Sequence, residues 1–448
     1  MNTTYASETY QAQSYEPPTR SGPGEAPLRA PVWEQILLAL WFYYTFIMRP
    51  GSELVLYPLA LYWSVAFVLN RRVTVPLALR SWLVFAIPVV AMLSWGWSPN
   101  PNQALKFGVM MTLGIVVAVY VAARFAPHEI ARSLFLAGLV AVIMVLPEMS
   151  HFGNRGPWGE KNIFAVRMVC VMLAAMAVAF NKYEIPWLRL AAFPLIPITY
   201  IYVIIAQSAT SLVFASGSIL AMVTIWLFWS RFSAIKHLRS FFMVFLLFAA
   251  LFIAYILANI GDRLYADFLE SLGKDTTLTG RTMLWDAADR ITREQPWLGT
   301  GAEGFWIWNS GDAATLLELS HKDAGTKFSF HNSYLEMQIH FGYVGLVLCY
   351  ALVGWCLWRT VLGWFASQSI ARSFFLLVTG IVFVSTFTES WLYVVFDTAV
   401  TLFYVSAISS LVRSDYARQL RQQTYAEAYA PTEPGLMTEP LAGLASAE

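Results

Sequence analysis

Residues 162–180 read NIFAVRMVCVMLAAMAVAF, an apolar run that contains a single charged side chain, Arg167. A transmembrane helix needs roughly 20 mostly apolar residues, so this run by itself predicts a membrane span. An arginine inside a span is costly and usually faces a cavity or a partner. Glu148, at the end of the preceding apolar run, is the partner that the sequence suggests.

The rest of the chain has the same character. Of its 448 residues, 58% are hydrophobic and 13% are charged, whereas soluble domains carry about 25% charged residues. Because a soluble surface needs more polar side chains, the composition excludes a soluble enzyme, a disordered chain, a coiled coil and a nucleic-acid-binding protein. The apolar runs are about twice as long as the strands of a membrane barrel. We therefore predict an all-α polytopic membrane protein.

About twelve transmembrane helices are predicted, nine within residues 31–260 and three within 332–412. The alternative is eleven, because the first apolar run is short and the last two are joined tightly. The tails, residues 1–30 and 413–448, are rich in small and polar residues and are predicted to be disordered. The expected spans begin near Trp33, Leu54, Trp82, Phe107, Ser133, Asn162, Leu188, Leu212, Phe241, Asn332, Ser373 and Tyr393.

The distribution of lysine and arginine predicts the orientation. Alternate short loops and tails carry about 17 of these residues on one side and about 4 on the other, and the richer side is normally cytoplasmic. Both termini are therefore predicted to be cytoplasmic.

One long segment, residues 261–331, connects the ninth and tenth expected spans. At about seventy residues it far exceeds an ordinary connection, and such loops are usually functional or disordered. A helical pattern runs from Thr282 to Glu294, and Pro296 follows as a stop signal. We predict a small folded cap on the outer face that carries short helices.

The first candidate site is residues 151–162, which read HFGNRGPWGEKN. Its glycines allow a tight turn that exposes backbone N–H groups, and the helix that follows presents its positive dipole end. With Arg155 and Lys161 beside that turn, the segment predicts a site for a phosphate or diphosphate. The alternative is a turn whose two cations reach lipid phosphates.

Two further candidates lie in and after the cap. Arg281 occurs in the first turn of the cap helix, where the dipole disfavours a cation, which suggests an external anion. His331 lies where the tenth span opens and has the right chemistry for a general base, with Asn332 or Ser333 as the helix cap. The alternatives are a plain surface arginine and a structural histidine. Glu336 and His340 are expected to pair.

The sequence shows no metal-type spacing of histidine, cysteine or acidic residues. We expect a metal-independent site, and the alternative is an Mg²⁺ ion held only through a substrate diphosphate. Residues 299–304, GTGAEG, lack the features of a phosphate-binding P-loop and are expected to form a structural turn. Trp297, Trp306 and Trp308 could offer flat faces to sugar rings, although for at least two of them we expect interface anchoring or packing within the cap.

The order of these motifs resembles the O-antigen ligase and polysaccharide polymerase superfamily, with the greatest likeness to bacterial exopolysaccharide repeat-unit polymerases. The resemblance covers about residues 90–410. The segments that carry it are GNRG at 153–156 with Lys161-Asn162, TGRT at 279–282, PWLGTG at 296–301 and HNSYL at 331–335.

This resemblance implies a metal-independent glycosyltransferase with a C-type membrane fold, in the bacterial inner membrane, with its active site at the periplasmic face. The substrate would be a glycan linked to undecaprenyl diphosphate. Arg155 and Arg281 would hold the diphosphate, and His331 would act at the acceptor hydroxyl. Further substrate contacts are expected from Lys161, Asn162, Asn332, Tyr334, Trp285 and Trp306.

The predicted function is thus polymerisation of lipid-linked repeat units of a cell-surface exopolysaccharide, with other export or chain-length proteins as partners. The nearest alternative is a ligase that transfers a finished glycan to a lipid A core or a protein. More distant alternatives are a flippase or other transporter of lipid-linked sugars and a structural subunit of an export complex.

Overall fold

The computed structural model describes residues 30–47, 51–147, 161–234, 281–307, 311–323, 326 and 328–412. Within these ranges the chain forms helices, loops and turns without a β-strand, as the all-α prediction requires. The α-helices are α1 (Val32–Ile47), α2 (Glu53–Leu69), α3 (Arg71–Arg80), α4 (Ala86–Leu93), α5 (Pro101–Arg124), α6 (Pro127–Val145), α7 (Lys161–Ala179), α8 (Pro186–Ile205), α9 (Ala209–Ala234), α11 (Arg281–Glu294), α12 (Gly311–Leu319), α13 (Ser333–Ser367), α14 (Ile370–Ser385) and a last helix, Thr398–Val412.

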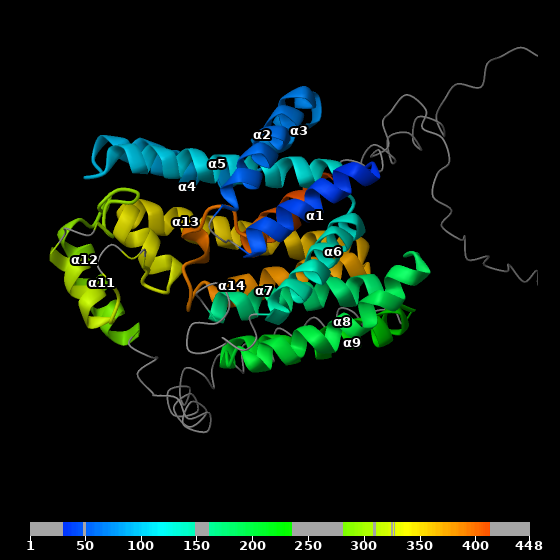
Figure 1. Cartoon of the computed structure of the whole chain (residues 1–448). Helices are drawn as coiled ribbons and strands as arrows, with labels where there is room; N and C mark the ends of the chain where they lie inside the picture. Colours follow the sequence, from blue (N-terminus) through cyan, green and yellow to red (C-terminus); the bar gives the residue numbers. More distant parts are fainter. Residues whose placement is uncertain are drawn as a thin grey trace, which may run out of the picture.

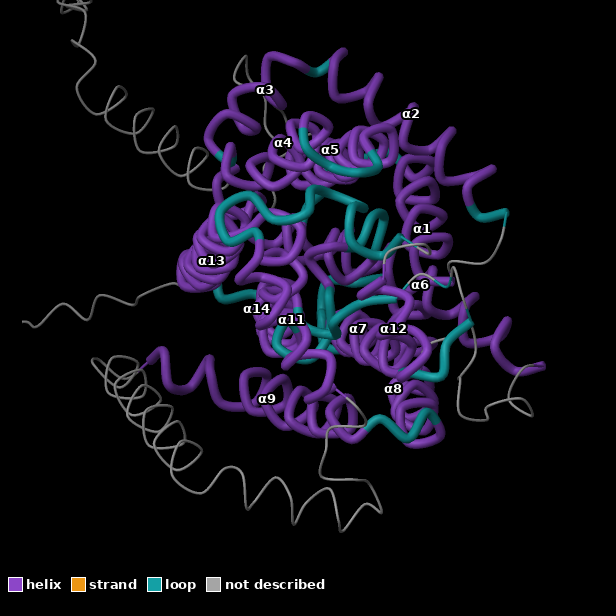
Figure 2. The backbone as a smooth tube through the Cα atoms, turned by 90° about the vertical axis from the view of Figure 1, so that its left-hand side faces the viewer, coloured by secondary structure: helices purple, strands orange, loops and turns teal. Residues whose placement is uncertain are grey.

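The long helices form a bundle, and α11 and α12 lie together at one end of it, which we call the cap end (Figure 1). Seen from that end, α7 lies in the interior of the bundle (Figure 2). It packs against α6, α8, α9 and α14, and every residue from Phe164 to Ala179 is buried. A helix that is hydrophobic on all sides is stable only in such a position, which explains why the run at 162–180 has no polar face.

The described helices fit a membrane protein. Six of them, α5 to α9 and α13, are long and apolar enough to cross a bilayer, and α2 and α3 form a further pair that is bent by 99°. Four shorter apolar helical segments accompany them. The span expected near Phe241 lies outside the described residues, so the count of twelve stays a prediction.

Several helices begin at other residues than expected. The spans predicted near Phe107 and Ser133 start earlier, at Pro101 and Pro127, because a proline at the first helical position loses no hydrogen bond and already has helical φ. The span predicted near Tyr393 starts later, at Thr398. There the side chain of Asp397 accepts hydrogen bonds from the backbone N–H groups of the first turn.

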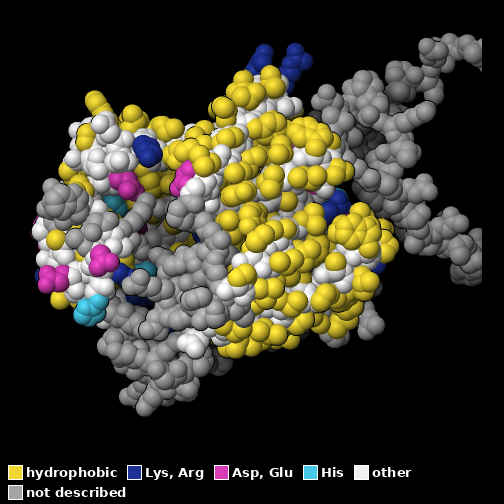
Figure 3. Space-filling view, in the orientation of Figure 1, with side chains coloured by type: hydrophobic (Ala, Val, Ile, Leu, Met, Phe, Trp, Pro, Cys, Tyr) yellow, Lys and Arg dark blue, Asp and Glu magenta, His cyan; other side chains and the backbone are white. Residues whose placement is uncertain are grey.

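The surface of the bundle matches a bilayer. Its flank is covered by hydrophobic side chains, acidic side chains gather at the cap end, and Lys and Arg side chains are also visible at the opposite end (Figure 3). Exposed aromatic residues mark the two ends of the apolar region, as expected for side chains at a membrane–water interface. Those nearer the cap are Trp95, Trp297 and Tyr343, and those at the opposite end are Trp33, Trp187 and Trp358.

Arg167 is buried within α7, and its partner is Asp397. Both Nη2 and Nε of Arg167 contact Asp397 Oδ2, at 2.6 and 3.1 Å, and Nη1 donates to the Phe46 carbonyl of α1 at 2.6 Å. Glu148, the partner that the sequence suggested, lies outside the described residues. The ion pair joins α7 to the last helix. The two helices lie far apart in the sequence, so the sequence alone did not indicate that they are neighbours.

The cap is joined to α13 at a break in that helix. Gly342 has φ of 61° and ψ of −154°, which interrupts the helix. Backbone N–H groups of Thr300, Gly301 and Tyr343 donate across this junction to the carbonyls of Ile339, His340 and Pro296 respectively. The turn predicted at residues 299–304 is therefore the segment that attaches the cap to the bundle.

Replacing Gly342 by alanine should destabilise the protein by at least about 2 kcal/mol, because the new methyl group would overpack this junction. It would lie 2.2 Å from the Trp297 carbonyl carbon, in a backbone conformation that alanine rarely adopts. The melting temperature of detergent-solubilised protein measures this effect. Gly354→Ala in the same helix is the control, since nothing lies within 4 Å of its Cβ. Equal melting temperatures for the two variants would contradict the expectation.

Candidate functional site

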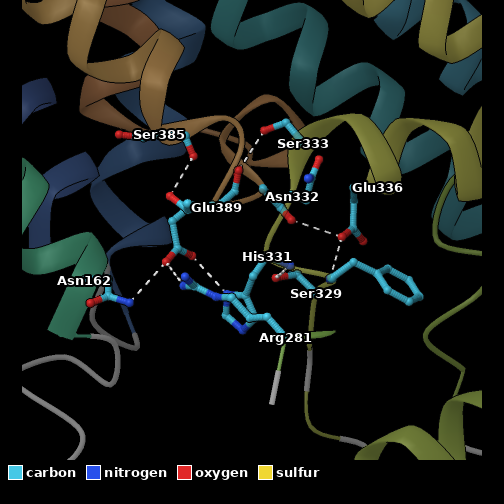
Figure 4. Close-up of polar contacts among 12 residues, drawn as sticks. Asn162, Arg281, Ser329, His331, Asn332, Ser333, Glu336, Ser385 and Glu389 are labelled. Carbon is cyan, nitrogen blue, oxygen red and sulfur yellow. Dashed lines mark hydrogen bonds and ion pairs between the residues drawn. The ribbon is translucent and has the colours of Figure 1, made fainter. Parts of the chain in front are cut away.

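The candidate site lies at the cap end, where four segments meet around the carboxylate of Glu389. This residue belongs to the loop between α14 and the last helix. Its Oε1 contacts Arg281 Nη2 at 2.6 Å and accepts from Asn162 Nδ2 at 3.2 Å, while Oε2 lies 3.0 Å from His331 Nδ1 (Figure 4). One carboxylate thus joins α11, the start of α7 and the segment before α13.

Glu389 is buried, and its charge is balanced by its neighbours. Burial by itself raises the pKa of a carboxyl group. Here the hydrogen bond and charge of His331, the charge of Arg281 and the amide of Asn162 outweigh burial and hold the pKa of Glu389 below its ordinary value. The group is therefore an ionised carboxylate at neutral pH.

His331 is held in an unusual backbone conformation. Its φ is +50°, in the left-handed region that non-glycine residues seldom adopt. The preceding residue, Phe330, is fixed on both sides: its N–H donates to Glu336 Oε2 at 2.8 Å, and its carbonyl accepts from Trp285 Nε1 at 2.9 Å. Conformations of this kind cost about 1–3 kcal/mol and persist where the surroundings fix them, often at functional sites.

The contact with Glu389 determines which nitrogen of the neutral imidazole carries the proton. A carboxylate only accepts hydrogen bonds, so Nδ1 must donate, and Nε2 of the neutral ring is left with a lone pair. The His331 side chain is 23% exposed. The ring therefore combines an oriented, basic Nε2 with access from outside the protein.

Arg281 is the first residue of α11, as the sequence predicted. A positive charge in the first turn is unfavourable against the helix dipole, and the ion pair with Glu389 offsets this cost. Among the described residues, Glu389 is the recorded partner of this guanidinium, which carries five N–H donors. The side chain is 14% exposed, so the group is positioned by the protein and still accessible.

The other predicted site residues fall into different environments. Asn162 contacts Glu389 directly, and Lys161 is the residue before it, at the start of α7. Asn332 caps α13, since its Oδ1 accepts from the N–H groups of Tyr334 and Leu335. Tyr334 is buried, with its ring stacked on Tyr350. Arg155 lies outside the described residues.

The tryptophans mostly belong to the cap's own packing. Trp285 donates to Phe330, and Trp306 packs with Phe305 and Phe330 and donates to Glu336 at 3.1 Å. Trp297 is exposed and contacts Tyr343 edge to face, in keeping with the interface anchoring that we expected for at least some of these tryptophans. Trp308 lies outside the described residues.

Residues 193–350 match a protein-family model described as O-Antigen ligase. The chain is also 24% identical over 310 residues to the exopolysaccharide production protein ExoQ of Rhizobium meliloti (strain 1021), and the match covers 66% of this chain and 68% of that protein. Over residues 193–350 the chain is similar to the O-antigen ligase family. In this O-antigen ligase-like protein the matched segment contains Arg281 and His331, whereas Asn162 and Glu389 lie before and after it.

Sequence reasoning about this O-antigen ligase-like chain missed the role of Glu389. The sequence shows it only as an acidic residue in the short connection between the last two expected spans. A signal was present, because a carboxylate between two apolar helices is costly unless it pairs, and Arg281 and His331 were already assigned to the same face.

The predicted pairing of Glu336 with His340 is confirmed, at 3.3 Å.

The described residues contain no group of three or more histidine, cysteine or acidic residues arranged to hold a metal ion. The three cysteines, Cys170, Cys349 and Cys356, are free and buried. None of them touches the carboxylate of Glu389, whose recorded partners are Arg281 and His331, with Asn162.

The lowered pKa of Glu389 predicts a pH-dependent contribution to stability. The unfolded chain takes up a proton near the ordinary glutamate pKa of about 4.3, while the folded protein still keeps the group ionised. The stabilisation is therefore complete above that pH and is lost as the pH falls through the lowered pKa. At neutral pH we expect the free energy of unfolding of wild type to exceed that of Glu389→Gln by about 1–3 kcal/mol, because the variant loses hydrogen bonds to a charged group.

Melting temperatures of detergent-solubilised protein between pH 3 and 7 test this expectation. The gap between wild type and Glu389→Gln should be constant near neutral pH and should shrink in acid. Glu318→Gln, which changes an exposed glutamate of α12, should match wild type throughout. If the difference in melting temperature widened in acid, the pKa of Glu389 would not be lowered in the folded protein.

Proposed function

We propose that this protein polymerises oligosaccharide repeat units of an exopolysaccharide that are linked to undecaprenyl diphosphate. The observation that carries the proposal is the convergence of Arg281 and His331, from segments fifty residues apart, on the one carboxylate of Glu389. The match of residues 193–350 to the O-antigen ligase family model and the similarity to an exopolysaccharide production protein support this reaction class.

His331 is proposed as the general base. The acceptor sugar hydroxyl attacks the anomeric carbon of the donor chain, the bond from that carbon to the diphosphate oxygen breaks, and the lipid diphosphate leaves with the electron pair. Nε2 of His331 takes the hydroxyl proton, and Glu389 stabilises the resulting imidazolium through Nδ1. Such a base contributes typically 10²–10⁴-fold to the rate.

Arg281 is proposed to bind the diphosphate. Negative charge grows on the departing phosphate in the transition state, and a fixed cation aimed there lowers its energy. The ion pair with Glu389 orients the guanidinium before substrate arrives. Arg155 would supply a second cation, and Lys161 would assist at the start of α7. In this scheme the arginines do the electrostatic work without a metal ion.

The proposed setting follows from the predicted orientation. The cap end would face the periplasm of a bacterial inner membrane, with both chain termini in the cytoplasm. The lipid-linked glycan would approach from the outer leaflet, beside the exposed aromatic residues near the cap. Export or chain-length proteins are further proposed partners.

A ligase is the second candidate, because the matching family model is described as O-Antigen ligase. It would use the same donor and the same residues, but the acceptor would be a lipid A core or a protein. The site residues do not separate the two reactions, since both transfer a glycan from a lipid diphosphate to a hydroxyl group.

The decisive experiment is incubation of purified protein with one defined lipid-linked repeat unit, followed by sizing of the products. A polymerase gives a ladder of lipid-linked oligomers and releases lipid diphosphate. A deletion strain provides the second arm: accumulation of single lipid-linked repeats supports the polymerase, and full-length unattached chains support the ligase. Transport of the lipid-linked sugar without bond formation would overturn both.

A further inference from the structure

A second buried carboxylate, Glu336 in α13, lies behind the site. Four groups contact it. Oε1 accepts from Trp306 Nε1 at 3.1 Å and lies 3.3 Å from His340 Nε2; Oε2 accepts from Phe330 N at 2.8 Å and from Ser390 Oγ at 3.0 Å. The residue is 1% exposed, so it does not itself meet a substrate.

Two of these donors are sequence neighbours of site residues. Phe330 directly precedes His331, and Ser390 directly follows Glu389. Oε2 of Glu336 therefore bonds to both of the segments that must stay in register for the 3.0 Å contact between His331 and Glu389 (Figure 4). A single oxygen atom of Glu336 links the two halves of this pair.

The link through Glu336 matters because the backbone of His331 is strained and depends on its neighbours to stay in place. A residue with φ of +50° returns to an ordinary conformation if its neighbours release it. The bond from Phe330 N to Glu336 is one of the restraints on the preceding residue, together with the bond from Trp285 to the Phe330 carbonyl. Loss of Glu336 would remove the hydrogen bond that holds the Phe330 N–H and, at the same time, the hydrogen bond that holds Ser390 in the Glu389 loop.

We propose that Glu336 is a positioning residue that holds His331 against Glu389, a role that rests on the proposed function of His331 as the base. It acts through these two residues and does not touch the substrate. The contacts of Glu336 with Trp306 of the cap and with His340 of α13, which itself contacts the Gly301 carbonyl, extend the same restraint to the cap.

The chemistry of the donors explains why a carboxylate is required. The indole N–H of Trp306 and the backbone N–H of Phe330 can only donate, and they address different oxygens of Glu336. A glutamine would have to turn its NH₂ group towards one of them in either orientation. Glu336→Gln keeps the size of the side chain and therefore breaks the network specifically.

The test is a double-mutant cycle with a purified lipid-linked repeat as substrate. Glu336→Gln should lower kcat roughly tenfold to a hundredfold, since misplacing a reacting group by about 1 Å can cost 10²-fold. KM for the lipid donor should stay near the wild-type value. Because Glu336 acts through the His331–Glu389 pair, the double variant with Glu389→Gln should have the same kcat as Glu389→Gln alone.

Glu34→Gln is the matched control. Glu34 is also buried and receives Arg124 at 2.7 Å, but in α1, at the end of the bundle opposite the cap. If Glu34→Gln changes kcat at all, the fold-change in the double variant with Glu389→Gln should be the product of the two single fold-changes. If the effects of Glu336→Gln and Glu389→Gln also multiply, or if Glu336→Gln keeps the wild-type kcat, Glu336 has no positioning role.

A milder variant covers the case in which Glu336→Gln does not fold. Ser390→Ala removes one donor to Glu336 and should lower kcat several-fold with KM unchanged, again without further loss when Glu389→Gln is added. Ser385→Ala is its control, because this buried hydroxyl bonds within α14, to the Ile381 carbonyl, and should leave kcat unchanged. Equal kcat for Ser390→Ala and Ser385→Ala would overturn the proposal.

The two levels of inference fail differently. If His331→Ala and Glu389→Gln both keep the wild-type kcat, the proposed base is wrong and the role of Glu336 falls with it. If those variants lose activity while Glu336→Gln and Ser390→Ala keep it, the proposed function stands and only the role of Glu336 is refuted.

Discussion

His331→Ala is expected to lower kcat about 10²–10⁴-fold, the usual contribution of a general base. Binding of the lipid-linked donor should change little, because the imidazole faces the acceptor hydroxyl in the proposed reaction. Turnover of a purified lipid-linked repeat, together with donor binding measured separately, distinguishes the two effects. The protein should stay folded, since the side chain is partly exposed and its loss removes the contact with Glu389 but not the backbone restraints.

A matched control for this variant is His321→Ala. His321 lies on the cap, is exposed, and has a positive φ of 53°, close to that of His331. His321→Ala therefore measures the effect of replacing a histidine in the left-handed conformation at a position outside the candidate site. Wild-type turnover at neutral pH for His331→Ala would remove this residue as the base.

Arg281→Ala should bring polymer below detection while the protein remains in the membrane. Removal of one fixed group that stabilises developing charge costs about 10²–10³-fold in kcat. Donor binding should weaken as well, because a guanidinium also binds the diphosphate of the ground state. Polymer formed in cells and turnover in detergent are the two measurements.

Arg281→Lys and Arg293→Ala make this result interpretable. The lysine keeps the charge but loses the bidentate geometry, so it should restore only part of the activity. Arg293 lies on the same helix, in an exposed ion pair with Asp289, and its loss should have little effect. Full polymer from Arg281→Ala would refute the diphosphate-binding role.

Local features of the site could be predicted from the sequence because their signals lie within a few residues. A cation in a first helical turn, an asparagine before an apolar run and a glutamate four residues before a histidine each depend on helix geometry alone. Arg281, Asn332 and the pair Glu336–His340 are found where those signals put them.

The features that were missed depend on which helices are neighbours. Glu389 becomes the centre of the site only because the loop after α14 lies beside α11 and the start of α7. The partner of Arg167 could not be chosen from the sequence for the same reason. The turn at residues 299–304 was recognised, but its attachment to the break at Gly342 required the packed structure.

The ion pair between Arg167 and Asp397 has a consequence for how the chain is made. The two residues are 230 positions apart, so at about 5–20 residues per second the ribosome needs roughly ten to fifty seconds between them. During that time α7 must enter the bilayer with an uncompensated arginine, at a cost of about 2.5–3.5 kcal/mol for a central position.

Two features of the chain make this interval tolerable. α7 has a mean hydropathy of 2.1, the highest of the six long spans. The Phe46 carbonyl, which accepts from Arg167 in the folded protein, is synthesised before α7. A transcript that stops before Asp397 would leave this guanidinium without its counter-ion inside the lipid. We expect membrane quality-control proteases to degrade such a shortened product, so the last helix serves biogenesis as well as architecture.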